Sequence, residues 1–348
     1  MTAARMPSSA VTSLVVGSRY LPVYLALILL LIVASIWAPA ALGGVALAAI
    51  APFGALLGIT ALGQMLVIMT GGIDLSVPGT LTLGAILMVG VGQQSDERIG
   101  IALMTAIGAA IVIGLVNGIL IGGLKLNALI VTLAVGQVVI GAVNRYDFPV
   151  QAQVPPALSA WTANRIWGVS PIFWIGLGLT ILVTVALRYT TIGRKFQVVG
   201  ANPVSARVVG VRVTLYQISA YVVAAVLYSL AGAALAGLYR TPAVNVGVPY
   251  LLGPIAAVVI GGASLTGGLA SPISTFAAAF FLTGLNQMMR TMGLPTSLQF
   301  VVFGLVIIGG MLISGDRIIK GVERVLRERR TPRRIESETT KTSTDAGD

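Results

Sequence analysis

The sequence predicts an all-α membrane protein: a polytopic bundle of about ten transmembrane helices, interrupted by two broken or re-entrant junctions. Hydrophobic residues make up 56% of the chain and charged residues only 9%, whereas soluble domains carry about 25% charged residues. The apolar residues form continuous runs and do not alternate with polar ones, which favours helices over a barrel. The 42 glycines suit close helix packing in lipid, where small side chains let backbones approach.

The chain contains no cysteine and no histidine. This excludes a disulfide framework, a Cys- or His-ligated metal site and a Cys or His nucleophile. Because acidic residues are also few, enzymatic acid–base chemistry has little to work with. We therefore predict that the chain is not an enzyme and holds no metal.

The individual spans follow from the apolar runs, since a membrane-spanning helix needs about 20 apolar residues. Ten segments qualify as candidates: Leu21–Ala38, Val45–Thr70, Val77–Gly92, Gly100–Leu124, Ala128–Val143, Pro171–Leu187, Leu215–Leu238, Leu252–Gly262, Pro272–Met289 and Leu298–Ser314. The first is predicted to be an uncleaved helix, although a signal peptide cleaved near Ala40 is the competing interpretation.

The distribution of Lys and Arg predicts the orientation. An even number of spans places both termini on one side, and 17 of the 22 basic residues then fall on that side. The positive-inside rule makes this side the cytoplasm. We predict a cytoplasmic N-terminal tail over residues 1–20, a transmembrane domain over residues 21–315, and a partly disordered cytoplasmic C-terminal tail over residues 316–348.

The first junction lies between the second and third spans, where Gly71, Gly72, Asp74 and Ser76 interrupt the apolar run. A carboxylate in hydrocarbon costs about 2.5 kcal/mol or more, and irregular backbone at membrane depth survives only inside protein or beside a watery cavity. We predict a broken or re-entrant junction in which Asp74 and Ser76 cap the next helix. The alternative is a plain polar turn with Asp74 in water.

The second junction repeats the skeleton of the first. Gly261, Gly262, Ser264 and Thr266 correspond to Gly71, Gly72, Asp74 and Ser76 in the first segment. Both segments fall at the same, cytoplasmic end by the span count. Two interrupted segments at matching positions predict a translocation path at a repeat interface.

The most basic internal loop, Thr190–Gln217, is also predicted to be cytoplasmic. Asn202 followed by Pro203 is typical of a helix start, and Gly210 of a helix end. A short helix on the membrane surface could bind a soluble partner, or could be an amphipathic connector lying among lipid headgroups.

Six polar residues fall within the predicted spans. Each of them could line a path for a hydroxylated solute or join neighbouring helices by hydrogen bonds. They are Gln64, Asn117, Gln137, Gln217, Asn286 and Gln287.

Three motifs, in this order, carry a resemblance to a known family. The segment Gly72–Val77 reads G-I-D-L-S-V, Gly200–Gly210 reads G-A-N-P-V-S-A-R-V-V-G, and Ile255–Gly268 contains G-G-A-S-L-T-G-G. The sequence resembles the permease subunits of bacterial ABC importers for monosaccharides, of the ribose, xylose and galactose type, from about the second span to Ser314. It departs from the family pattern at Pro78, where the family has glycine, and at Val209, where it has serine.

The resemblance implies the function, partners and site residues. It implies a subunit of an ATP-driven importer in the bacterial cytoplasmic (inner) membrane, which translocates a monosaccharide or related polyol brought by an extracytoplasmic binding protein. The implied partners are a cytoplasmic ABC ATPase, a second permease subunit and membrane lipid, with no nucleic acid. No cofactor is implied for this chain, since ATP is bound by the partner, consistent with the lack of a G-x-x-x-x-G-K-[ST] loop. The ATPase coupling loop comprises Gly200, Asn202, Pro203, Ala206, Arg207 and Gly210.

Two alternatives stay open at this stage. A permease of the branched-chain amino-acid type shares the implied architecture. An ion-coupled secondary carrier would need an intramembrane ionisable residue, for which Asp74 is the candidate.

Overall fold

The computed structural model describes residues 8–145 and 153–314, and these residues are almost entirely helical. The isolated pair Ile166 and Val169 forms the one β-bridge given for this part of the chain. The α-helices are α1 (Ser8–Trp37), α2 (Gly44–Met69), α3 (Val77–Gly90), α4 (Ile99–Gly118), α5 (Ala128–Arg145), α6 (Pro156–Ala163), α7 (Pro171–Tyr189), α8 (Thr191–Ala201), α9 (Pro203–Val208), α10 (Val213–Tyr239), α11 (Gly253–Ile260), α12 (Pro272–Thr291) and α13 (Thr296–Ser314). Short turns of helix are η1 (Pro39–Leu42), η2 (Asp96–Arg98), η3 (Ile119–Gly123) and η4 (Val248–Tyr250).

Six helical segments of the described chain are long and apolar enough to cross a membrane. They belong to α1, α2, α4 with its flanking turns, α5, α7 and α10. Shorter apolar helices occur at α3, at η4 with α11, and within α13. Every predicted span overlaps one of these helices or α12, so the all-helical class is confirmed and the chain is a multi-pass membrane protein.

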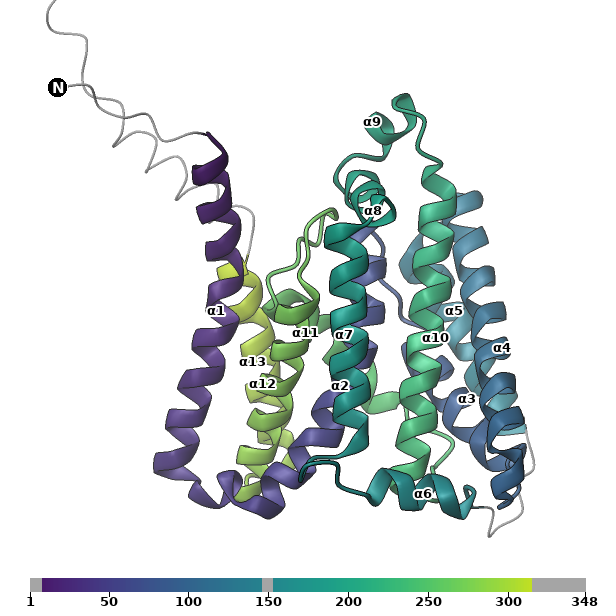
Figure 1. Cartoon of the computed structure of the whole chain (residues 1–348), viewed down its shortest axis with the longest axis vertical. Coiled ribbons are helices and arrows are strands. Elements are labelled where there is room, and N and C mark those ends of the chain that lie inside the picture. Colours follow the sequence, from purple (N-terminus) through teal and green to yellow (C-terminus); the bar gives the residue numbers. More distant parts are fainter. Residues whose placement is uncertain (1–7, 146–152, 315–348) are drawn as a thin grey trace, which may run out of the picture.

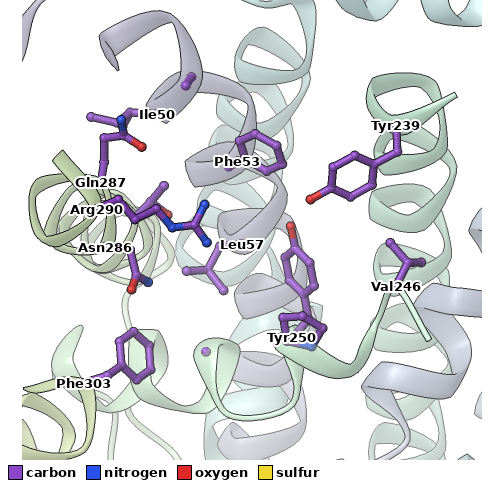
Figure 2. A pocket seen from close by; sticks show the side chains of 14 residues that line it. Ile50, Phe53, Leu57, Tyr239, Val246, Tyr250, Asn286, Gln287, Arg290 and Phe303 are labelled. Carbon is purple, nitrogen blue, oxygen red and sulfur yellow. The ribbon is translucent and has the colours of Figure 1, made fainter. Parts of the chain in front are cut away.

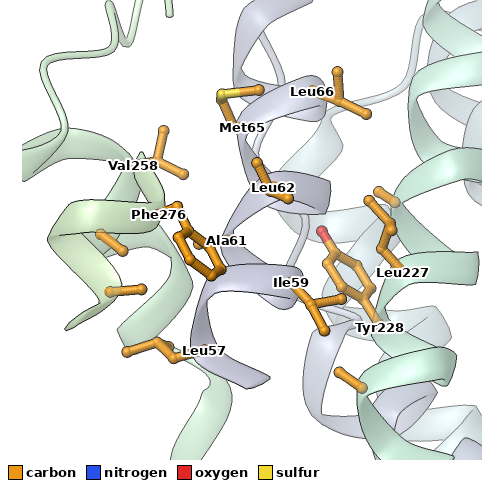
Figure 3. Packing of buried hydrophobic residues seen from close by; sticks show 14 of the residues in the cluster. Leu57, Ile59, Ala61, Leu62, Met65, Leu66, Leu227, Tyr228, Val258 and Phe276 are labelled. Atoms are coloured by element: carbon orange, nitrogen blue, oxygen red, sulfur yellow. The ribbon is translucent and has the colours of Figure 1, made fainter. Parts of the chain in front are cut away.

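The helix α2 lies at the centre of the bundle and packs against α7, α10, α11 and α12. Figure 3 shows its side chains contacting Tyr228 of α10 on one side and Phe276 of α12 on the other. Glycine makes this close packing possible, because a Cβ built on Gly63 would lie 2.7 Å from the Tyr228 ring. By contrast, α1 packs mainly against α12 and exposes much of its apolar surface, as a lipid-facing helix does.

The two ends of the bundle carry different elements (Figure 1). The helices α8 and α9 lie together at one end, and α6 lies at the other. The predicted start of α9 is confirmed, because the Asn202 side chain accepts hydrogen bonds from the backbone N–H groups of Val204 and Ser205, both at 3.0 Å. Sequence analysis missed α8, whose N-cap Thr190 accepts from Gly193 N–H at 3.1 Å. The predicted C-terminal tail, residues 316–348, lies outside the described residues.

Candidate functional site

The first junction, residues 70–76, connects α2 to α3. Its side chains form hydrogen bonds with one another. Asp74 has no exposed surface. Its Oδ1 accepts hydrogen bonds from the Ser76 backbone N–H at 2.8 Å and from the Ser76 hydroxyl at 2.6 Å. The predicted capping of α3 by Asp74 and Ser76 is therefore wrong. Ser76 is the N-cap residue but its side chain accepts from no helix N–H, and Asp74 accepts from Ser76 itself.

Side chains of three helices, α2, α4 and α5, form hydrogen bonds with this junction. Asn117 of α4 donates to the Ser76 hydroxyl oxygen at 3.0 Å, and the Leu75 N–H donates to the Thr132 hydroxyl oxygen of α5 at 2.9 Å. With its amide oriented to satisfy its neighbours, Gln64 of α2 accepts from the Asp74 N–H at 3.2 Å and donates to the Asp74 carbonyl at 3.1 Å. The same amide donates to the hydroxyl of Tyr228 on α10 at 3.0 Å. The irregular backbone is thus satisfied within protein, as the membrane interior requires.

Three buried polar atoms around this junction have no hydrogen-bond partner in the described structure: Asp74 Oδ2, Asn117 Oδ1 and the Tyr221 hydroxyl. The Tyr221 hydroxyl lies directly over Gly72, where a Cβ would overlap it. Buried polar groups are normally paired. Three unpaired polar atoms at one place in an apolar core therefore mark the junction as a candidate functional site.

The second junction, residues 261–271, connects α11 to α12 and ends its helix in the same way as the first. Gly71 and Gly262 adopt nearly equal left-handed φ angles, 84° and 83°, and each donates to the carbonyl three residues earlier. The structural match is therefore shifted by one residue from the predicted one, which paired Gly71 with Gly261. Its polar side chains also differ: the Ser264 and Thr266 hydroxyls lie 2.8 Å apart, and Thr266 is exposed.

The predicted coupling loop, which begins at Gly200, contacts both junctions at one point. The Gly268 N–H of the second junction donates to the Met69 carbonyl at the end of α2, at 2.9 Å. Gly200 of α8 lies against both groups, because a Cβ there would overlap the Met69 oxygen and lie 2.6 Å from the Gly268 nitrogen. The structure thus brings together three segments that the sequence placed only at the same end of the bundle.

The remaining coupling-loop residues lie around α9. Ala206 is fully buried against Val199 and Val213, which fixes α9 to the bundle. Asn202, Arg207 and Gly210 are exposed, and so are Val204, Val208 and Val209. One face of α9 is therefore anchored, and the opposite face presents apolar side chains beside a basic one.

A cavity of about 320 Å³ opens in the other half of the bundle (Figure 2). It lies between the first half of α2, the end of α10, η4, α12 and α13. Its walls include the rings of Phe53, Tyr239, Tyr250 and Phe303. Its polar lining comes mainly from α12, through Thr283, Asn286, Gln287 and Arg290. Asn286 and Gln287 were predicted from the sequence either to line a solute path or to join helices, whereas Thr283 and Arg290 were not named for such a role.

Comparison with known proteins identifies the family. Residues 46–311 match the family described as the permease component of branched-chain amino acid transport systems. The chain belongs to this permease family. It is 30% identical over 271 residues to the ribose import permease protein RbsC of Escherichia coli strain K12, covering 74% of this chain and 82% of the relative.

Other members of the permease family are similarly close. The autoinducer 2 import system permease protein LsrC of Salmonella choleraesuis is 30% identical over 285 residues, covering 80% of both chains. LsrC of Enterobacter sp. strain 638 is 31% identical over 258 residues, covering 74% of this chain and 75% of the relative. No solved structure gives a significant match. The predicted resemblance is confirmed at the level of the family, which consists of transport permease subunits.

Proposed function

We propose that this chain is the membrane-spanning subunit of an ATP-driven ABC importer that carries a monosaccharide or related polyol across a bacterial inner membrane. The observation that carries the proposal is its similarity to RbsC and LsrC over 74% and 80% of the chain, because these relatives are named for ribose and autoinducer 2 import. A binding protein outside the membrane delivers the solute, and a cytoplasmic ATPase drives its passage. The permease acts as a dimer with a second permease subunit.

The proposed topology has ten spans with both termini in the cytoplasm. The six long apolar helices supply most of the spans, and α3, α11, α12 and α13 supply the others. Arg194, Lys195, Arg207 and Arg212 lie in or beside α8 and α9, which supports a cytoplasmic location for that end of the bundle.

The surface proposed for the ATPase is the exposed face of α9. Exposed apolar side chains beside a cation are typical of a protein-binding surface, and Val208 is 85% exposed. Movement of α9 would reach the junctions directly, because α8 precedes it with one intervening residue and Gly200 contacts both Met69 and Gly268. The junction residues Gly71, Gly72, Asp74, Ser76, Gly261, Gly262, Ser264 and Thr266 are proposed to border the path when the importer opens inward.

The test of ATPase docking is the variant Gly210→Arg, for which Gly293→Arg is the matched control. Both glycines have left-handed φ angles, 79° and 69°, and no atoms lie within 4 Å of a Cβ built on either. Gly210 follows α9, whereas Gly293 lies in the turn between α12 and α13. Both variants therefore carry a comparable backbone strain of about 1–2 kcal/mol.

The measurement is purification of the tagged permease from its native membranes, followed by identification of any bound ATPase. We expect the wild type and Gly293→Arg to retain an ABC ATPase, and Gly210→Arg to lose it while still inserting in the membrane. Normal recovery of the ATPase with Gly210→Arg, or no ATPase with the wild type, would count against the proposal.

A further inference from the structure

The cavity opposite the coupling loop has a lining with a distinctive chemistry. Thr283, Asn286, Gln287 and Arg290 recur at helical spacing, so they form one polar stripe along α12. The neighbouring positions Leu282, Leu285 and Met289 are buried in the apolar core. This stripe is also why α12 is missing from the apolar helices long enough to cross a membrane. Polar amides on one face of a bundle helix are costly in lipid and indicate a functional site, and the exposed Arg290 in the last turn of α12 adds a cation beside them.

Aromatic rings complete the wall opposite the stripe. Phe53 and Tyr239 lie with ring centroids 6.1 Å apart, and Figure 2 shows the Tyr239 and Tyr250 hydroxyls directed into the space between α2 and α10. The cavity thus offers flat apolar faces together with hydroxyl, amide and guanidinium groups. A sugar presents complementary groups, because its C–H faces suit aromatic rings and its hydroxyls both donate and accept hydrogen bonds.

The charge of the lining narrows the ligand class further. None of the fourteen lining residues is acidic, and Arg290 is basic. The ammonium group of an amino acid would find no carboxylate here and would be repelled by the Arg290 guanidinium. The volume of about 320 Å³ is near the lower end of the range for small-molecule sites, about 300–1,000 Å³, which fits a single sugar unit.

We propose that this cavity receives the transported solute on the extracytoplasmic side, that it admits uncharged or anionic monosaccharides, and that it disfavours amino acids because no lining carboxylate can pair with their ammonium group. This inference rests on the proposed function for the direction of transport. The family is named for amino acid transport, whereas the relative RbsC is named for ribose import. The inference assigns this chain to the sugars and not to the amino acids.

The test uses the natural absence of cysteine from the chain. A single cysteine is introduced into the purified full-length permease by Thr283→Cys, inside the cavity, or by Ala160→Cys, on exposed α6 outside it. Each protein is labelled with two methanethiosulfonate reagents, one bearing a sulfonate and the other a trimethylammonium group. We expect the sulfonate reagent to react faster with the Thr283→Cys variant by on the order of tenfold, with little difference for Ala160→Cys. Adding Arg290→Gln should remove the preference inside the cavity.

The second arm identifies the ligand class by protection. D-ribose as the neutral probe or D-gluconate as the acidic probe should slow the labelling of the Thr283→Cys variant in proportion to its concentration, whereas leucine should not. Absence of the charge preference, failure of both sugars to protect, or protection by leucine would each overturn the inference. If the wild-type permease bound no ATPase, the proposed function would be contradicted, but these labelling rates would not change.

Discussion

The two junctions end their helices with the same backbone turn but are held by different parts of the molecule. Around the first junction, side chains from α2, α4 and α5 form hydrogen bonds with residues 74–76, and Asp74 is fully buried. The second junction has no charged side chain. Its Gly267 and Gly268 instead lie against the backbones of Gly200 and Met69, while Leu265 and Thr266 are exposed.

This difference assigns the junctions different mechanical properties. A network of buried hydrogen bonds to several helices fixes the first junction in one arrangement. The second junction is joined to α2 by the hydrogen bond from the Gly268 N–H to the Met69 carbonyl and packs through glycine against α8, so a displacement of α8 and α9 acts on it directly. We expect the first junction to act as the fixed point and the second as the moving part.

The largest effect is expected from Gly200→Val, which breaks the contact common to both junctions. A Cβ at this position would overlap the Met69 carbonyl oxygen and press on the Gly268 backbone. Because neither neighbour is a flexible side chain, α8 must move away, and ATP-driven uptake should fall to background. The measurements are uptake in cells of a labelled monosaccharide that the wild type is found to transport, and the melting temperature of the purified permease.

A milder test at the same position is Gly200→Ala. Its control is Gly108→Ala, at a glycine outside the contact. Gly108 lies in α4 with open space around a Cβ, so its alanine variant should stabilise the helix slightly, by about 0.5–1 kcal/mol. If Gly200→Ala retains full uptake and the wild-type melting temperature, the three-segment contact has no mechanical role.

The next largest effect concerns Asp74, the residue that distinguishes the first junction from the second. Asp74→Leu removes the acceptor of the Ser76 N–H and hydroxyl bonds, leaving buried donors unpaired at about 1–3 kcal/mol each. Asp74→Asn keeps an acceptor oxygen at nearly the same position and should cost much less. Melting temperatures in detergent should therefore rank wild type close to Asn and well above Leu.

Uptake by the Asn variant tests a further point. Retention of sugar uptake in Asp74→Asn cells treated with an uncoupler, with ATP maintained, agrees with an ATP-driven importer. An ion-coupled carrier would lose uptake under the same treatment. Equal melting temperatures for the Leu and Asn variants would show that the first junction is not fixed by this carboxylate.

Much of this architecture could be predicted from the sequence, because the signals are local. Continuous apolar runs predicted the helices, and Asn202-Pro203 predicted the start of α9. The glycine pairs at 71 and 261 predicted chain breaks at the same end of the bundle. Each of these patterns depends on a few neighbouring residues, so it survives without knowledge of tertiary packing.

The rest depends on contacts between distant segments. The buried junction around Asp74 is held by side chains of distant helices, since Asn117 of α4 bonds Ser76 and Thr132 of α5 bonds the Leu75 N–H. Gly71 corresponds to Gly262 in the structure and not to Gly261, because the two helices end at different points of the aligned motifs. The sequence similarity of the motifs does not reveal where each helix ends. The cavity could have been anticipated from the spacing of Thr283, Asn286, Gln287 and Arg290, but its aromatic wall comes from α2, α10, η4 and α13.

The smallest effects come from a pair of hydroxyls at positions that the sequence matched, Ser76 and Thr266. The Ser76 hydroxyl is buried and lies between Asp74 and Asn117, at 2.6 and 3.0 Å. Ser76→Ala should therefore cost about 1–3 kcal/mol, because Asn117 loses its acceptor in an apolar environment. The Thr266 hydroxyl is within reach of water, so Thr266→Ala should cost less than about 1 kcal/mol. Equal decreases in melting temperature for the two variants would contradict this expectation. They would mean that the two junctions are held alike, as their sequence similarity suggests, despite their different packing.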